Sequence, residues 1–413
     1  MKLSKTTQKQ LIKVDYKIFK EKIFSLFFNN LVHKVLVYYE QMNYQIQPKY
    51  FYKKRGKVLT STIHIYCDVI DNFGDAGFCL RLSRDLSRFF KTNLFCNNLE
   101  ILKKITNKED LSSENLQISS WPTPTDNYEV PDVVIEAFSC RLPEYILEKL
   151  RKIPPLIIEL EYLTAENFAD DCHTLSSFAD GLSSYFFFPG FTKQTGGVIF
   201  EKEFINKATQ IQSSTVDSDK KKISLFSYPQ ANLKALIHSL FNSKYQFEIT
   251  LFEGLPLKAV NSQFNLNLEV GDKYQLKNIE FIVKKMVSQE EYDSLICKSD
   301  LNLVRGEESI VRAMLCGKPF LWNIYPQEEY AHKIKLEAFF DRMYEFCEDK
   351  KTAQKLKNLN LSYNNFADDL YELDFDKFYD DWMSICQNWT KYLQSLGSLT
   401  DNLKSFIESK LKK

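Results

Sequence analysis

The sequence predicts an α/β protein made of two Rossmann-like domains that face a cleft. Short apolar segments of strand type alternate with helical patterns in both halves of the chain, which is typical of parallel sheets covered by helices. A polar stretch, residues 207–221, separates the halves and is interpreted as an interdomain linker. The chain has 413 residues, more than one hydrophobic core usually serves, so two domains are expected.

The bulk composition narrows the class of protein. Lys+Arg and Asp+Glu both number 54, which argues against a protein that binds nucleic acid through general positive charge. No run of about eighteen apolar residues occurs, so we expect no membrane span, no membrane partner and a cytoplasmic location. The nine cysteines are scattered and lack zinc-type spacing, so buried thiols are expected rather than a disulfide framework.

The N-terminal half begins with an extension and continues as a domain. Residues 1–57 are lysine-rich with some helical spacing, and they carry no recognisable chemistry. The N-terminal domain is predicted over residues 58–206, where the alternating strand Ile63–Cys67 leads into an acidic turn and a helix. Asp71 and Asp75 lie in this turn, where a carboxylate could attract a cation or remove a proton. A structural role is also open, with Asp75 as the N-cap of the helix and Asp71 stabilising the turn.

The C-terminal half repeats the alternation of strands and helices. A second Rossmann-like domain is predicted over residues 222–365, beginning with a strand at residues 223–228. Residues 366–413 are helical in pattern and are expected to pack back on the N-terminal domain.

A turn in this second domain, Arg305-Gly306-Glu307-Glu308-Ser309, connects a strand to a helix. The N-terminus of such a helix presents unpaired N–H groups, and α/β proteins hold phosphates there. Arg305 adds a cation suited to phosphate oxygens, whereas Glu307 and Glu308 suit sugar hydroxyls. Alternatively, Ser309 or Glu308 caps the helix and Arg305 pairs with a surface carboxylate.

Eight segments between about residues 60 and 340 carry a specific resemblance. They are CDVIDNFGDAG (67–77), IEAFSCRLPEY (135–145), LEYLTAENF (160–168), YFFFPGFTKQTGG (185–197), SLFSY (224–228), SQEEYDSL (288–295), SDLNLVRGEESIVRAMLCGKPFLWNIYPQ (299–327) and AHKIKLEAF (331–339). In this order they resemble the bacterial elongation factor P arginine rhamnosyltransferases (EarP). Glu308 stands where that family usually has aspartate.

The resemblance implies a GT-B fold and inverting transfer of L-rhamnose from dTDP-β-L-rhamnose to an arginine of elongation factor P, which relieves polyproline stalling. No cofactor and no metal would be needed. Asp75 matches the proposed base and Asp71 its acidic neighbour, and Glu307 completes the catalytic set. Donor contacts would come from Asn72, Gly74, Phe226, Tyr228, Gln289, Tyr292, Arg305, Glu307, Glu308, Ser309 and Tyr325.

Two alternatives remain open from the sequence. One is a GT-B transferase that uses another nucleotide sugar and a non-protein acceptor, with the acidic turn serving a hydroxyl. The other is a nucleotide-sugar-binding protein without turnover. The combination of Asp71, Asp75 and Glu307 disfavours the second alternative, because a binding protein needs no base.

Overall fold

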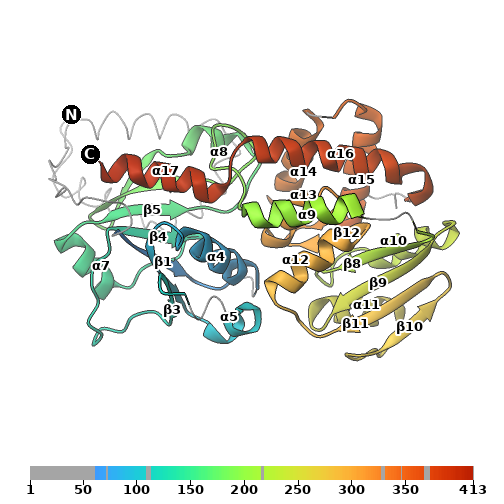
Figure 1. Cartoon of the computed structure of the whole chain (residues 1–413), viewed down its shortest axis with the longest axis horizontal. Helices are drawn as coiled ribbons and strands as arrows, with labels where there is room; N and C mark the ends of the chain where they lie inside the picture. Colours follow the sequence, from blue (N-terminus) through green and yellow to red (C-terminus); the bar gives the residue numbers. More distant parts are fainter. Residues whose placement is uncertain are drawn as a thin grey trace, which may run out of the picture. The chain divides into compact units, whose positions relative to one another are not determined.

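The computed structural model describes residues 61–70, 73–107, 113–214, 218–326, 331–345, 347–366 and 373–412. All of them belong to one unit that spans residues 55–413. Two sheets organise this unit, one in each half of the chain, and helices cover their faces (Figure 1). The extension over residues 1–57, with its predicted helical face, lies outside the described residues.

The first sheet has seven strands in the order β3-β2-β1-β4-β5-β7-β6. They are β1 (Thr62–Cys67), β2 (Lys91–Cys96), β3 (Leu116–Ser119), β4 (Val133–Ala137), β5 (Leu156–Leu160), β6 (Ser176–Ala179) and β7 (Leu182–Phe187). Neighbouring strands are parallel except β6, which runs antiparallel to β7. The strand order reverses between β1 and β4, and ligands of open α/β sheets bind outside the carboxyl ends of strands at such a point.

The second sheet has six strands in the order β10-β11-β9-β8-β12-β13. They are β8 (Lys220–Leu225), β9 (Gln246–Phe252), β10 (Lys273–Leu276), β11 (Ile279–Lys284), β12 (Leu301–Arg305) and β13 (Phe320–Asn323). The strands are parallel apart from β10, which pairs antiparallel with β11. Here the strand order reverses between β8 and β12, so the Arg305 turn follows one of the two strands at the switch point.

The strands read as apolar runs because helices bury both faces of each sheet. Every residue of β5 (LIIEL) and of β12 (LNLVR) is buried. The helices of the first half are α4 (Phe73–Leu86), α5 (Leu99–Ile105), α7 (Glu144–Lys152), α8 (Asn167–Cys172) and α9 (Lys202–Ser214). Those of the second half are α10 (Leu233–Ser239), α11 (Leu255–Phe264), α12 (Gln289–Lys298), α13 (Glu308–Leu315), α14 (Ala331–Glu345), α15 (Lys350–Tyr363), α16 (Phe375–Ser395) and α17 (Leu399–Leu411). The predicted architecture of two α/β domains is confirmed.

The segment between the two sheets contains a helix, α9. Residues 207–214, which the sequence assigned to a linker, form the second part of α9, and β8 already begins at Lys220. Helix α9 packs against α12 of the second domain, and the Gln212 amide donates a hydrogen bond to the Cys316 carbonyl. The connection is therefore attached to the second domain over much of its length.

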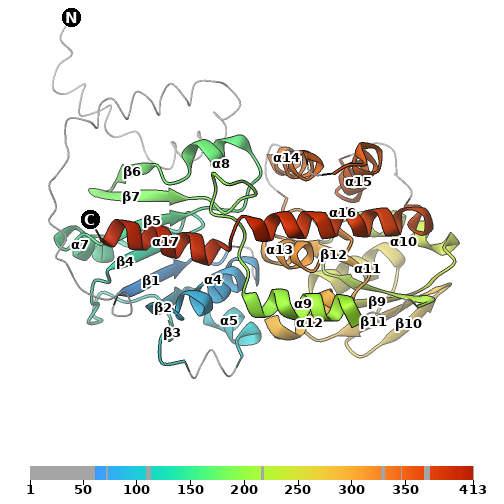
Figure 2. The same ribbon diagram turned by 45° about the horizontal axis from the view of Figure 1, so that its top comes forward.

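The C-terminal helices contact both domains (Figures 1 and 2). Helix α16 packs on α13, where the Thr390 hydroxyl donates to the Met314 carbonyl at 2.5 Å. Helix α17 packs on α4 and β5 of the first domain, and the Leu399 N–H donates to the Val198 carbonyl at 2.9 Å. The chain thus crosses back from the second domain to the first.

The cysteines differ from the expectation in one pair. Cys297 at the end of α12 and Cys316 after α13 are joined as a disulfide. The expectation of thiols alone is wrong for this pair, because neighbouring helices of the second domain bring together two cysteines that are 19 residues apart in the chain. The other seven cysteines are free.

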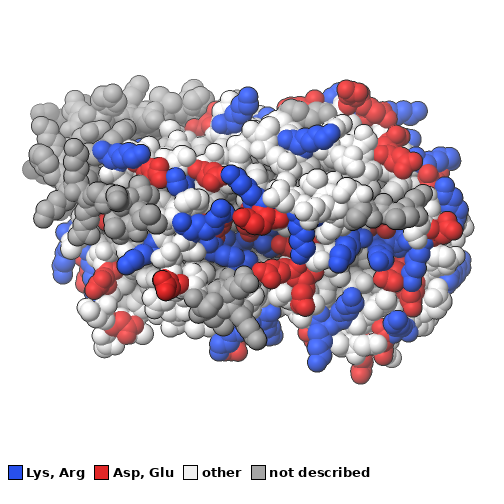
Figure 3. All heavy atoms as spheres, in the orientation of Figure 1, with Lys and Arg blue, Asp and Glu red and all other residues white. Residues whose placement is uncertain are grey.

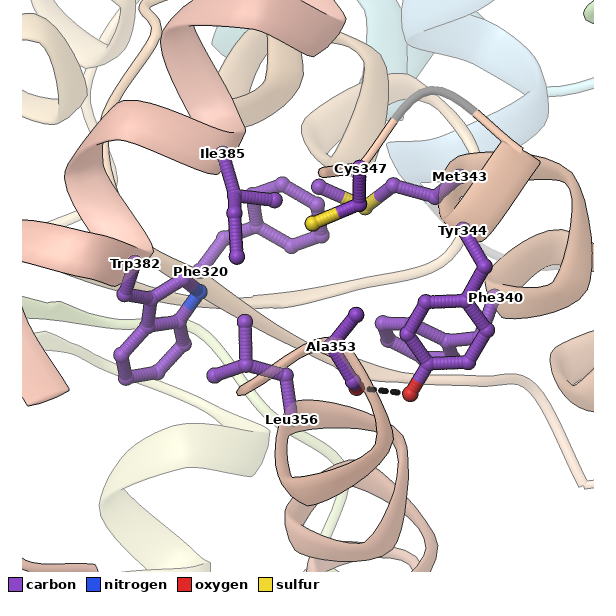
Figure 4. Close-up of a pocket in the computed structure, with 9 residues that line it drawn as sticks. All are labelled: Phe320, Phe340, Met343, Tyr344, Cys347, Ala353, Leu356, Trp382 and Ile385. Atoms are coloured by element: carbon purple, nitrogen blue, oxygen red, sulfur yellow. Dashed lines mark hydrogen bonds between the residues drawn. The ribbon is translucent and has the colours of Figure 1, made fainter. Parts of the chain in front are cut away.

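A small apolar cavity lies among the helices of the second half (Figure 4). Its volume is about 10 Å³, and its lining includes Phe320, Met343 and Trp382. The hydroxyl of Tyr344 is turned to the Ala353 carbonyl, to which it donates a hydrogen bond. The lining is almost entirely apolar and the Tyr344 hydroxyl is already bonded, so a space of this size is a gap in the packing.

The charged side chains on the surface reflect the equal numbers of basic and acidic residues in the sequence. Lys and Arg side chains are interspersed with Asp and Glu side chains on the face in Figure 3. No described helix is both long enough and apolar enough to cross a bilayer.

Candidate active site

A cavity of about 240 Å³ lies where the two domains meet. Its lining from the first domain consists of Ile70, Gly74, Asp75, Phe78, Phe138 and Tyr162. The second domain contributes Gly306, Glu307, Trp322, Ile324, Tyr325 and Lys335. The loops after β1 and β4 and the turn after β12 all reach this cavity, so the switch points of both sheets face one space.

Asp75 lies in the first turn of α4, and its residue is 4% exposed. Its Oδ2 accepts a hydrogen bond from the Ile70 N–H at 2.9 Å, and this bond ties the turn to the helix. The alternative that Asp75 is the N-cap is wrong in detail, because α4 already begins at Phe73. The helix dipole and this N–H stabilise the ionised carboxylate. The hydrogen bond also holds the Asp75 side chain in place at the wall of the cavity.

Glu307 precedes α13 and lines the same cavity from the opposite domain. Its Oε1 is 2.5 Å from Lys335 Nζ, and its Oε2 accepts the Leu163 N–H at 2.7 Å. Burial raises the pKa of Glu307, while the Lys335 ammonium and the Leu163 N–H oppose this rise and the negative charge of Asp75 adds to it. The two carboxylates therefore interact across the cavity.

The Gly306 backbone shapes the turn between β12 and α13. Its φ of 63° lies in the left-handed region that favours glycine, and the Trp322 indole N–H donates to its carbonyl at 2.7 Å. The Ser309 hydroxyl accepts the Arg305 N–H at 3.2 Å and donates to the Arg305 carbonyl. Ser309 thus closes the turn through the backbone of Arg305.

The Arg305 side chain is enclosed by aromatic rings. Its Cζ lies 4.2 Å from the ring centroid of Phe226 and 4.9 Å from that of Tyr228. The ring of Tyr292 lies 5.6 Å from that of Phe226, and the ring of Tyr325 lies 5.6 Å from that of Tyr228. The structure therefore brings five of the predicted donor residues into one cluster at the carboxyl ends of β8 and β12.

Two predicted donor residues lie elsewhere. Glu308 Oε1 accepts from Arg81 Nε at 2.9 Å and from Nη2 at 2.6 Å. The Gln289 amide donates to the Gly77 carbonyl of α4 at 2.9 Å. In this structure both side chains bridge the two domains outside the cavity lining, and Asp71 and Asn72 lie outside the described residues.

Glu308 belongs to a buried interdomain ion cluster, which consists of Arg81, Glu201, Asp293, Glu308 and Arg312. The arginine side chains are 3% and 0% exposed. Burial opposes ionisation of Glu201, but the two guanidinium groups outweigh this effect and lower its pKa to about 2. This cluster was not predicted, because its one local signal in the sequence is the i,i+4 spacing of Glu308 and Arg312.

Four aromatic residues of the cavity wall were also not predicted, among them Phe138 and Tyr162. Phe138, after β4, has φ 57°, and Ser139 has φ 60°, which is an uncommon conformation for residues with a Cβ. The Phe138 ring stacks on the Tyr162 ring at 4.5 Å. Backbone strain of the kind that the positive φ angles of Phe138 and Ser139 indicate is concentrated at functional sites. The segments IEAFSC and LEYLT hold these residues, but their letters gave no chemical signal.

The described residues contain no group of three or more His, Cys, Asp or Glu side chains that could hold a metal ion. The cations that line the cavity or its neighbouring turn come instead from Lys335 and Arg305.

Comparisons with known proteins agree with this arrangement. The family described as Elongation-Factor P (EF-P) rhamnosyltransferase EarP matches residues 63–408. A protein-arginine rhamnosyltransferase of Pseudomonas aeruginosa is 34% identical over 324 residues, covering 73% of this chain and 86% of that protein. One from Neisseria meningitidis is 29% identical over 369 residues, covering 83% of this chain and 96% of its own length. The solved structure presented as the structural basis for EarP-mediated arginine glycosylation of translation elongation factor EF-P has a TM-score of 0.58 and 21% identity, and covers 84% of this chain and 99% of that one.

Two Rossmann-like domains whose switch points share one cavity form the GT-B architecture, and the predicted fold is confirmed. The family match and the relatives identify the chain as a glycosyltransferase. The chain belongs to the EarP family of elongation factor P rhamnosyltransferases. The family match extends beyond the eight resembling segments, because it also includes helix α16 and most of helix α17.

Proposed function

We propose that this protein transfers L-rhamnose from dTDP-β-L-rhamnose to an arginine side chain of elongation factor P, with inversion at the anomeric carbon. The observation that carries the proposal is the cavity in which Asp75 of one domain faces Glu307 and Lys335 of the other, beside the Arg305 cluster. Membership in the EarP family and the names of the relatives support the sugar and the acceptor residue.

The donor is proposed to bind the second domain with its diphosphate at the Arg305 turn. Arg305 supplies a permanent cation, and the start of α13 adds backbone N–H groups and a positive dipole end. Breaking the bond between the anomeric carbon and the phosphate oxygen leaves dTDP with additional negative charge, which these groups stabilise. Phe226, Tyr228 and Tyr292 offer aromatic surface for the nucleotide, and Glu307 and Tyr325 face the sugar from the cavity wall.

The acceptor is proposed to enter on the side of Asp75. A guanidinium is cationic and a poor nucleophile, with a pKa above about 12. An ionised Asp75 would orient it and take a proton from the attacking nitrogen while the new C–N bond forms. Attack from the face opposite the departing phosphate is a single displacement, so the β-linked donor gives an α-linked product.

The test is incubation of the protein with elongation factor P and dTDP-β-L-rhamnose, followed by intact mass and peptide mapping. We expect a gain of one deoxyhexose on an arginine, and NMR of the product should show the α anomer. Parallel reactions with UDP-glucose and UDP-galactose serve as donor controls. Unchanged elongation factor P with dTDP-β-L-rhamnose, or transfer from a UDP-sugar at an equal rate, would contradict the proposal.

A further inference from the structure

Lys335 of α14 lies in the cavity wall, but the proposed steps of donor binding and proton removal do not use it. Its side chain is 14% exposed, and its ammonium nitrogen is 2.5 Å from Glu307 Oε1. The same nitrogen lies 5.7 Å from the centre of the Tyr162 ring. Lys335 is therefore held between a carboxylate of its own domain and an aromatic ring of the other domain.

The charges of the cavity can be counted from its lining. Among the described residues that line it, Asp75, Glu307 and Lys335 carry charge. Within this described part of the lining, two carboxylates and one ammonium leave one net negative charge, and a guanidinium acceptor carries one positive charge. Lys335 thus neutralises one carboxylate and leaves the charge of the other for the acceptor.

The two carboxylates also differ in their contacts. Both oxygens of Glu307 are engaged, one by Lys335 and the other by the Leu163 N–H. These bonds fix the direction of the carboxylate and join α14 to the loop after β5 of the first domain. Lone pairs that remain on Glu307 can still accept hydrogen bonds from sugar hydroxyls.

We propose that Lys335 is a positioning residue that keeps Glu307 ionised and correctly oriented as a hydrogen-bond acceptor for the transferred sugar. This inference rests on the proposed function. Among the described residues, the titratable groups that line the cavity with Glu307 are Lys335 from α14, Asp75 from α4, Tyr162 from the loop after β5 and Tyr325 after β13. Of these, Lys335 supplies the positive charge.

Removal of the ammonium has a defined consequence. Burial and the charge of Asp75 raise the pKa of Glu307, and Lys335 opposes that rise. In Lys335→Met the pKa of Glu307 therefore increases further, and we expect its carboxyl to hold a proton up to a higher pH than in the wild type. Each unit by which its pKa exceeds the assay pH reduces the ionised fraction about tenfold. Where the Glu307 carboxyl is protonated, the proton replaces the lost positive charge, and the net charge available to the acceptor is then unchanged.

The experiment measures kcat and KM for elongation factor P from mildly acidic to mildly alkaline pH. Lys335→Met should lose about tenfold or more in kcat at neutral pH with little change in the acceptor KM. Its kcat should recover as the pH rises and Glu307 ionises again. Lys335→Arg, which retains the charge, should stay near wild type, and so should Lys333→Met, a control on the same helix outside the described cavity lining.

Glu307→Gln provides the second arm because its side chain is neutral at every pH. It should reproduce the low kcat of Lys335→Met near neutrality without the recovery at high pH. A Lys335→Met enzyme with wild-type kcat at neutral pH, or with the same loss at every pH, would overturn the inference. Failure of the wild-type protein to transfer rhamnose at all would instead overturn the proposed function, so the two failures are distinguishable.

Discussion

Replacing Asp75 with asparagine tests the proposed base with little change in structure. Asp75 is 4% exposed and accepts the Ile70 N–H at 2.9 Å through one carboxylate oxygen. An asparagine has the same size, and its carbonyl oxygen can accept the same hydrogen bond. Asp75→Asn therefore keeps the link between the turn and α4 but removes the group that takes the proton.

The expected loss can be estimated from this change. Removal of a general base typically lowers the rate by about 10²–10⁴-fold. This corresponds to about 3–5 kcal/mol of transition-state stabilisation. The assay is a single-turnover reaction with donor and elongation factor P, read by mass, together with calorimetry of dTDP binding. Transfer should fall within that range, while dTDP affinity should remain near wild type because the Arg305 cluster is untouched.

A control variant distinguishes loss of the catalytic base from a general disturbance of the turn. Asp68, at the other end of the loop that follows β1, accepts a hydrogen bond from the Asn97 amide and is not among the described cavity residues. Asp68→Asn should transfer at close to the wild-type rate. Both variants should melt near the wild-type temperature. A fully active Asp75→Asn enzyme would refute the assignment and leave Asp75 with the structural role of fixing the turn.

Three further predictions concern other parts of the chain. Arg305→Ala should weaken binding of dTDP and of dTDP-rhamnose alike in calorimetry, because the cation is proposed to address the phosphates; an unchanged dTDP affinity would remove that assignment. Glu308→Ala should lower the melting temperature, because loss of one partner from a buried ion pair typically costs about 3–5 kcal/mol of stability. The loss should lie toward the lower end of this range, because Asp293 and Glu201 still face Arg81. An unchanged melting temperature would contradict a structural role for this pair. A chain that begins at Val58 should fold and transfer rhamnose at nearly the full-length rate, because the family match begins at residue 63, and aggregation or a tenfold slower single turnover would show the opposite.

Much of the fold could be predicted because parallel strands buried on both faces require apolar runs. β12 (LNLVR) and β5 (LIIEL) carry this pattern in their letters. The boundary between the two domains was harder to predict. The polar residues 207–214 look like a linker, yet they form a helix whose Gln212 side chain bonds to the Cys316 carbonyl. A surface helix with a polar face has a composition similar to that of a loop. The two are therefore hard to distinguish in the sequence unless the surface that the helix packs on is known.

The site was predictable where a side chain depends on its own turn, and less so where it depends on a distant partner. Asp75 and Glu307 follow strands at switch points, so the topology alone brings both to the cavity. Lys335 lies on a helix that also carries Lys333, and side chains two positions apart project from different sides of a helix. Which lysine faces the cavity depends on how α14 packs, and the sequence does not reveal this.

The adjacent acids Glu307 and Glu308 show why two identical letters serve different purposes. At the start of α13 successive side chains point in different directions, so when Glu307 faces the cavity Glu308 must face elsewhere. That other direction leads to Arg81, which is 227 residues away in the chain, and Glu308 Oε1 lies 2.9 Å from its Nε. An aspartate at this position would be one methylene shorter than Glu308, so the length of the glutamate side chain sets its reach to Arg81 of the opposite domain. The turn thereby joins the site to the interface: its backbone supports Arg305, one acid lines the cavity, and the next binds the first domain beside it.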